Sequence, residues 1–502
     1  MEARESSAQG GDEMASRDDA ELPDGSQDNS SFETAGLQRS LSAIDRQYAA
    51  QPEQPRRIHI LGTGSIGKLV AHSLRGIANP PPISLIFHRY RLLEAWEQSK
   101  KQITIQDDDF DVSRGGYDVE LMSEVRRQHG VELENGQPSV YDFPDEVRPH
   151  EAAKLLAQQR KENAALQQQQ LESGEQDTQF PPSRDERKRR PGKGDYAISH
   201  EPIHNLIVTT KAAYTVPALS AIKHRLGPTS TVCFLQNGMG VIDDVNKHLF
   251  PHEADRPNYV QGILTHGVNV PPELAERDPF FAVHAGHGTI ALGLLPRSGI
   301  KQTTITGQDG AADTHHVQTE LWAPSARYLL RTLTRTPVLC AVGFTPTELL
   351  QQQLEKLAVN SVLNPLTALL DARNGALLHN FALTRTMRLL LAETSLVIRS
   401  LPELAYLPNV PTRFSAARLE TLVISVAHKT QDNVSSMLAD VRAGRRTEIE
   451  YINGYIVRRG EEVGVKCVVN YGIMQTVVGK CMVTQREGQD AVPMVGVAGL
   501  NV

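Results

Sequence analysis

The sequence predicts an α/β domain followed by an all-helical domain, and three observations support this fold class. First, RIHILG, GTGSIG and KLVAHSLRGIA follow one another as an apolar strand, a glycine turn and an amphipathic helix. Second, strand-like and helix-like stretches keep alternating up to about residue 344. Third, only long helical runs follow, such as TELLQQQLEKLAVNSVLNPLTALLDA and TRTMRLLLAETSLVIRSL.

Composition excludes several classes of protein. The chain has 502 residues, of which 40% are hydrophobic, and this is enough for about two or three domains. Its net charge of -7 gives no general case for binding nucleic acid or anionic membranes. No apolar run approaches the roughly 20 residues of a membrane helix. The four cysteines form no CxxC pair, so we expect reduced thiols. No metal-binding residues are predicted. The polar, acidic N-terminus resembles no targeting signal, so a cytoplasmic protein is expected.

Changes in composition predict the domain boundaries. Residues 1–54 contain few large apolar side chains, and we predict a disordered acidic extension. Residues 55–344 form the α/β domain, interrupted at about 101–200 by a low-complexity insertion with the Gln-rich run AQQRKENAALQQQQ. Its RKRR is interpreted as a solvated loop rather than a nuclear signal. Residues 345–485 form the helical domain, and 486–502 a loose tail.

The glycine turn predicts a dinucleotide site. The first glycine permits a tight turn after the strand, the second lets backbone amides approach a pyrophosphate, and the third lets helix and strand pack closely. The N-terminus of the following helix favours an anion. A glycine-rich turn without ligand is the plainer alternative, but the strand and helix on either side favour binding. The predicted contacts are Gly62, Thr63, Gly64, Ser65, Ile66 and Gly67.

The end of the second strand favours NADPH over NADH. An enzyme that uses NADH usually places an acidic residue there to bind the ribose hydroxyls. This chain has His88, Arg89 and Arg91, and a guanidinium can pair with a 2′-phosphate. Arg89 is the preferred contact, and a solvated loop arginine is the alternative. Lys211 in VTTKA and Asn237 in QNGMG end two further strands, where open α/β sheets bind ligands.

A polar stripe follows one of the long helices. Lys356, Asn360 and Asn364 are spaced i, i+4, i+8 among apolar neighbours, so they share one side of a helix buried on several sides. A lysine in such a cleft can donate a proton to a forming alkoxide while amides hold the substrate. A solvated polar face is the alternative. Pro365 should perturb this helix, because its ring does not fit a regular interior turn without relief.

Near the C-terminus, SSMLADVRAGRRTEIEYINGYIVRRG contains two further candidates. Ser436 and Glu448 lie 12 residues apart (448 − 436). Thr447 and Glu450 match a T-x-x-E capping box, which leaves Glu448 free for another role. Alternatively, Glu448 is an acid in the first turn of a helix, favoured there by the helix dipole.

Taken in order, GTGSIG, VTTKA, QNGMG, KLAVNSVLNPLTALLDARNG and SSMLADVRAGRRTEIEYINGYIVRR resemble the ketopantoate reductase family. The last two blocks are the most specific, and the likeness covers about residues 56–485 except the insertion and some loops. The resemblance implies a Rossmann-type domain joined to an all-α domain, with the active site in the cleft between them. It also implies NADPH-dependent reduction of 2-dehydropantoate to (R)-pantoate, a step towards pantothenate and coenzyme A.

The resemblance also implies a role for each matching residue. Lys356 resembles the catalytic lysine and proton donor, and Glu448 the glutamate near the reacting centre. The substrate positions are Asn360, Asn364, Asn374 and Ser436. The cofactor positions are the six residues from Gly62 to Gly67, with Arg89, Lys211 and Asn237. Val268 matches a backbone contact to the cofactor only loosely.

The chain departs from compact family members in its extension, its insertion, a longer segment near residues 295–350, and Glu355 before the catalytic lysine. The partner implied is a small-molecule 2-keto acid, and a homodimer stays open. Two other functions also stay open. One is a reductase of another branched 2-keto acid. The other is a non-catalytic NADPH-binding sensor or scaffold, although the presence of Lys356 and Glu448 speaks against it.

Overall fold

The structure, a computed structural model, describes residues 55–122, 127–128, 131–134, 137–138, 199–296 and 323–490. Three predicted segments lie outside these ranges: the acidic extension at 1–54, the Gln-rich part of the insertion with its RKRR run, and the chain after residue 490. Within the described ranges, no helix combines the length and the apolar character that crossing a bilayer requires.

An eight-stranded sheet forms the core of the first domain. Its order is β15-β14-β11-β10-β9-β1-β2-β5, and the strands from β11 to β5 all run parallel. Short strands buried along their whole length are typical of parallel sheets covered on both faces. The bounds are β1 Ile58–Leu61, β2 Ile83–Phe87, β5 Tyr117–Leu121, β9 Asn205–Val208, β10 Thr231–Phe234, β11 Asn258–Leu264, β14 Ile290–Leu294 and β15 Ala341–Gly343.

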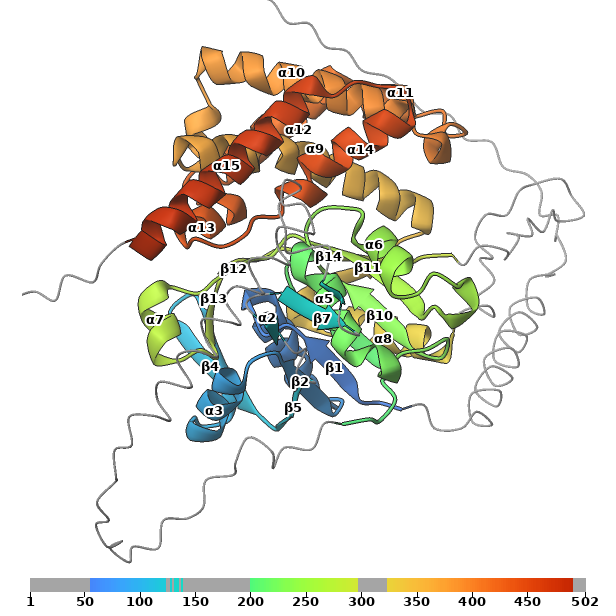
Figure 1. Cartoon of the computed structure of the whole chain (residues 1–502), viewed down its shortest axis with the longest axis vertical. Helices are drawn as coiled ribbons and strands as arrows, with labels where there is room; N and C mark the ends of the chain where they lie inside the picture. Colours follow the sequence, from blue (N-terminus) through green and yellow to red (C-terminus); the bar gives the residue numbers. More distant parts are fainter. Residues whose placement is uncertain are drawn as a thin grey trace, which may run out of the picture. The chain divides into compact units, whose positions relative to one another are not determined.

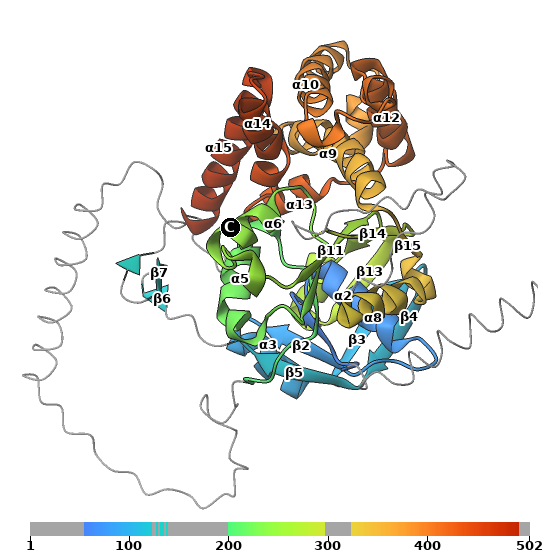
Figure 2. The ribbon, with the colours of Figure 1, turned by 90° about the vertical axis from the view of Figure 1, so that its right-hand side faces the viewer.

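Helices cover both faces of this sheet (Figure 2). On one face, α2 (Ser65–Arg75) and α8 (Pro324–Thr334) share a hydrophobic core with alternate residues of β1 and β2. On the other face, α5 (Thr215–Ile222) and α6 (Val241–His248) pack against β9 and β10. This arrangement confirms the predicted Rossmann-type domain.

A second, four-stranded sheet corrects the predicted start of the insertion. Its order is β12-β13-β3-β4, with bounds Gly267–Asn269, Phe281–Gly286, Gln102–Asp107 and Phe110–Gly115. Residues 102–121 therefore form three strands, β3, β4 and β5, rather than part of a low-complexity insertion. The physical reason is burial: Ile103 and Ile105 pack with Trp96 of α3 (Tyr90–Gln98) and with Phe280. Helix α7 (Pro272–Arg277) lies between β12 and β13 in the sequence. The short strands β6 (Arg127–Gln128), β7 (Val131–Glu134) and β8 (Gln137–Pro138) form a separate, three-stranded sheet.

The second domain consists of helices around α9 (Figure 1). Helix α9 begins with a capping box between Thr345 and Glu348, and it packs against α10, α12, α13 and α15. The all-helical domain is therefore confirmed. The bounds are α9 Pro346–Leu370, α10 Phe381–Arg399, α11 Val410–Arg413, α12 Ala416–Lys429, α13 Ser436–Arg442, α14 Asn453–Glu462 and α15 Val468–Asp490.

Two details of this domain differ from local expectation. Helix α9 continues through Pro365, which cannot donate a hydrogen bond to the carbonyl of Ser361 four residues earlier. The Asn453 side chain supplies the missing donor, with its Nδ2 2.9 Å from Ser361 O. At the other end of the domain, α15 runs to Asp490, so residues 486–490 are helical rather than part of a loose tail. Val477 and Cys481 anchor α15 in the core, and the helix continues beyond them.

Candidate active site between the two domains

The glycine turn has the geometry that its sequence predicts. Gly62 has φ +101°, in the left-handed region that favours glycine. A Cβ on Gly67 would lie 1.9 Å from the carbonyl oxygen of Gly62, so only glycine lets α2 approach β1 this closely. A Cβ on Gly64 would meet nothing within 4 Å, and α2 begins at the next residue. A helix N-terminus beside open space fits the pyrophosphate of a dinucleotide.

The predicted strand-end residues share one edge of the main sheet. Lys211 follows β9, Asn237 follows β10 and Arg89 follows β2, and these strands run parallel with β1. Their carboxyl ends, including the end of β1 that carries the glycine turn, therefore point the same way. Arg89 is exposed at the start of α3, which fits a contact with a 2′-phosphate. Val268 lies in β12 of the second sheet, paired with His284.

The Lys356 ammonium bridges the two domains. From α9, its Nζ donates to Asn237 Oδ1 at 2.9 Å and to the backbone oxygen of Leu264 at 2.7 Å. Burial lowers the pKa of Lys356 to about 8, and the Glu448 carboxylate partly opposes this shift. A lysine with a pKa near neutrality is suited to proton transfer.

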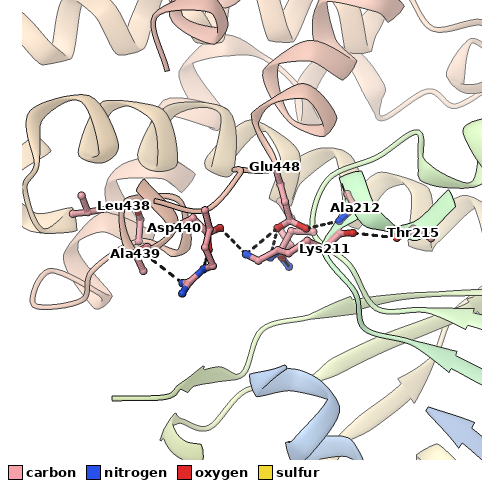
Figure 3. Close-up of polar contacts among 11 residues, drawn as sticks. Lys211, Ala212, Thr215, Leu438, Ala439, Asp440 and Glu448 are labelled. Carbon is pink, nitrogen blue, oxygen red and sulfur yellow. Dashed lines mark hydrogen bonds and ion pairs between the residues drawn. The ribbon is translucent and has the colours of Figure 1, made fainter. Parts of the chain in front are cut away.

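Glu448 and Lys211 belong to the same polar network (Figure 3). Glu448 accepts from the backbone N–H of Ala212 at 3.1 Å and from Asn237 Nδ2 at 3.4 Å. The Lys211 Nζ lies 2.7 Å from Asp440 Oδ2 and 3.8 Å from Glu448 Oε2. Burial opposes the charge on Lys211, but the two carboxylates outweigh it and raise the pKa of this lysine. Asn237 thus joins Lys356 to Glu448 through one amide.

A small pocket adjoins this network. Its wall combines polar groups from both domains with apolar side chains, a mixture that is common in small-molecule sites. Among the predicted substrate residues, Asn360 is the one in this wall. The lining residues are Gln236, Asn237, Gly238, Met239, Gly262, Ile263, Gln353, Lys356, Leu357 and Asn360.

Three other predicted substrate residues lie outside this contact network. Asn364 is buried one turn further along α9. Asn374, in the short helix η6 (Asn374–Leu377), donates from Nδ2 to Thr430 Oγ1 at 2.9 Å, and its buried Oδ1 has no hydrogen-bond partner. Ser436 is exposed at the first position of α13, and its neighbour Ser435 caps that helix. Within the described part of the chain, none of the three bonds to Lys356 or Glu448.

The structure corrects one local prediction and adds one residue to the site. Thr447 and Glu450 form no capping box, because Glu450 pairs instead with Arg446 at 2.6 Å. Glu448 takes no part in such a cap, and its carboxylate accepts hydrogen bonds from Ala212 and Asn237 instead. The sequence analysis missed Asp440, which pairs with Lys211. The available signal was its position four residues after Ser436, on the same side of α13.

Comparisons with known proteins identify relatives of this chain. Family models match for Ketopantoate reductase PanE/ApbA at residues 148–297 and Ketopantoate reductase PanE/ApbA C terminal at residues 348–480. A probable 2-dehydropantoate 2-reductase of Schizosaccharomyces pombe is 32% identical over 279 residues, which cover 55% of this chain and 74% of the relative. A ketoisovalerate reductase of Beauveria bassiana is 23% identical over 483 residues, which cover 88% of this chain and 87% of the relative.

The fold also matches solved structures. A ternary complex of D-mandelate dehydrogenase with NADH and anilino(oxo)acetate superposes with a TM-score of 0.53 at 17% identity. The match covers 85% of this chain and 99% of that protein, and at this identity it supports the fold alone. On the two family models and the Schizosaccharomyces pombe relative, the chain belongs to the ketopantoate reductase PanE/ApbA family.

Proposed function

We propose that this protein reduces 2-dehydropantoate to (R)-pantoate with NADPH, with Lys356 as the proton donor. The observation that carries the proposal is the position of the Lys356 ammonium, which lies in the pocket wall and is hydrogen bonded across the two domains. The glycine turn and the exposed Arg89 support NADPH as the cofactor. NADPH would supply a hydride to the C2 carbonyl carbon of the substrate.

Lys356 is prepared for proton donation. An ammonium has three N–H donors, and two of them are bound to Asn237 Oδ1 and to the oxygen of Leu264. The third is therefore left for the carbonyl oxygen of the substrate, which becomes an alkoxide during reduction. With a pKa of about 8, Lys356 is about nine-tenths protonated at pH 7. It can stabilise the developing charge and then give up its proton more easily than an ordinary lysine.

Asn237 and Glu448 orient this lysine. The Asn237 amide accepts from Lys356 through Oδ1 and donates to Glu448 through Nδ2. Glu448 therefore favours the amide orientation that presents an acceptor to Lys356. We assign Asn360 to the substrate, since it shares the pocket wall with Lys356. Small displacements in such an arrangement would lower the rate substantially.

A second candidate substrate is ketoisovalerate. Relatives named ketoisovalerate reductase align with 84–88% of this chain, whereas the Schizosaccharomyces pombe relative aligns with 55%. The two keto acids share a branched alkyl group, which Met239, Ile263 and Leu357 can contact. They differ in a hydroxymethyl group. A site that bonds this hydroxyl would reject ketoisovalerate strongly, whereas a purely apolar site would not.

The test measures kcat/KM of the full chain with each keto acid, using NADPH and NADH in parallel. We expect the highest value for 2-dehydropantoate with NADPH. Higher kcat/KM with ketoisovalerate would replace the proposed substrate by the second candidate. Binding of NADPH without turnover of either acid would instead support a sensor or scaffold.

A lysine variant tests the assigned chemistry. In Lys356→Met, we expect turnover to fall by about 10² to 10⁴ while NADPH affinity, measured by fluorescence titration, stays nearly unchanged. The matched control is Lys429→Met, which removes an exposed ammonium from α12. Turnover in Lys356→Met equal to that of the control would remove Lys356 from the mechanism.

A further inference from the structure

Three potential metal ligands meet at one end of the second sheet, apart from the polar network of Lys356. Asp107 ends β3, and the parallel pairing of β3 with β13 places it opposite His284. His287 follows in the loop after β13. Asp107 Oδ1 lies 3.7 Å from His284 Nδ1 and 3.1 Å from His287 Nε2, and the three ligand atoms all lie within 4.8 Å of one another.

The hydrogen bonds around His266 determine which nitrogen of His284 carries a proton. His266 Nε2 lies 3.1 Å from the carbonyl oxygen of Leu339, so this nitrogen is the donor. His266 Nδ1 accepts from the backbone N–H of Gly288 at 3.1 Å, so it carries no proton. It also lies 3.0 Å from His284 Nε2, which must therefore be the donor of that pair. In the neutral ring, His284 Nδ1 is then a bare lone pair.

This lone pair is buried and points at a carboxylate. The His284 side chain is 1% exposed, and no hydrogen bond joins its buried Nδ1 to Asp107 Oδ1. The same carboxylate oxygen lies 3.1 Å from Nε2 of the exposed His287. Two facing acceptors are unfavourable unless a proton or a metal ion lies between them.

A nearby histidine does not complete the group. The Asp107 carboxylate also interacts electrostatically with His72, but both ring nitrogens of His72 already have other polar contacts. Its Nε2 bonds the carbonyl oxygen of Val112 at 2.9 Å, and its Nδ1 lies 3.3 Å from Arg114 Nη1. The cluster therefore offers two imidazole nitrogens and one carboxylate oxygen.

We infer that Asp107, His284 and His287 bind one divalent transition metal ion, with Zn²⁺ as the ion to test. Two imidazoles and a carboxylate are suited to such ions, and three protein ligands leave a fourth tetrahedral position for water. The bond from His284 Nε2 to His266 is the outer contact that usually orients a metal-binding histidine. A bound ion would join β3, β13 and the following loop.

The experiment titrates Zn²⁺ into the chelator-treated full chain by calorimetry, with Mg²⁺ in parallel. We expect one equivalent of Zn²⁺ to bind, no binding of Mg²⁺, and a thermal midpoint that rises with Zn²⁺. Substitution of Co²⁺ should give the visible absorption of a tetrahedral site. No NADPH or keto acid is present, so the result is independent of the proposed reductase activity.

Two variants locate the site. His287→Ala alters an exposed loop side chain and Asp107→Asn is nearly isosteric, so both should fold. Each should weaken Zn²⁺ binding at least tenfold and abolish the thermal shift. The control His252→Ala removes an exposed histidine elsewhere and should bind as the unmodified chain does. Absence of stoichiometric binding at micromolar Zn²⁺, or unchanged affinity in both variants, would overturn the inference.

Discussion

Replacing Glu448 with Gln tests whether this carboxylate keeps the Lys356 ammonium protonated. The two residues are joined through Asn237 by bonds of 2.9 Å and 3.4 Å, which limit their separation to roughly 8 Å when the width of the amide is added. With an effective dielectric constant of about 20, charges at this distance attract by about 2 kcal/mol. Since one pKa unit corresponds to about 1.4 kcal/mol, the carboxylate raises the pKa of Lys356 by roughly 1.5 units.

The assay is the dependence of kcat/KM on pH between about 6 and 10. The protonated lysine is the donor, so activity should fall as pH rises through the pKa of about 8. Loss of the Glu448 charge favours the neutral amine and lowers this pKa. The alkaline limb of the profile in Glu448→Gln should therefore move to lower pH by about 1.5 units.

Glu450→Gln is the matched control, because it removes the same charge two residues away. Its carboxylate pairs with Arg446 rather than with the site, so the profile should match that of the unmodified chain. An alkaline limb that stays near pH 8 in Glu448→Gln, or that moves to higher pH, would refute the electrostatic coupling. Equal shifts in both variants would show that general charge, rather than the Asn237 connection, is responsible.

Four further substitutions give distinct outcomes. Gly67→Ala should lower the free energy of unfolding in urea by about 3 kcal/mol, because its Cβ would meet the Gly62 oxygen. Gly64→Ala should leave the free energy of unfolding unchanged but weaken NADPH binding. Arg89→Ala should reduce the preference for NADPH over NADH by about tenfold in KM, since one charge-assisted contact is lost; an unchanged ratio would assign the 2′-phosphate elsewhere. Asn453→Ala should lower the free energy of unfolding in urea by about 2 kcal/mol. The Ser361 carbonyl, to which Pro365 cannot donate a hydrogen bond, would lose the donor that Asn453 provides.

Several features were predictable because they depend on neighbouring residues. The strand, glycine turn and first helix lie within 20 residues, and the glycine requirements at Gly62 and Gly67 follow from that local geometry. The stripe of Lys356 and Asn360 follows from helical periodicity. The change from alternating elements to long helices likewise marked the domain boundary before α9.

Local patterns failed where the environment decided the outcome. Residues 102–115 fall within the predicted insertion at about 101–200, yet they form a hairpin because Ile103 and Ile105 are buried against α3 and Phe280. The T-x-x-E pattern at Thr447 failed because Arg446 binds Glu450. The relief that Pro365 requires inside α9 comes from another helix, where Asn453 supplies the lost donor.

By itself, the sequence determined which side chains share a turn or a helix face, and therefore the fold class and most candidate residues. Only the tertiary structure decided that Lys356 bonds Asn237, 119 positions away, and that Lys211 pairs with Asp440, 229 positions away. It also decided that Asp107 faces His284. Periodicity describes neighbours along the chain, whereas these pairs form because packing of the sheets and helices brings distant segments together.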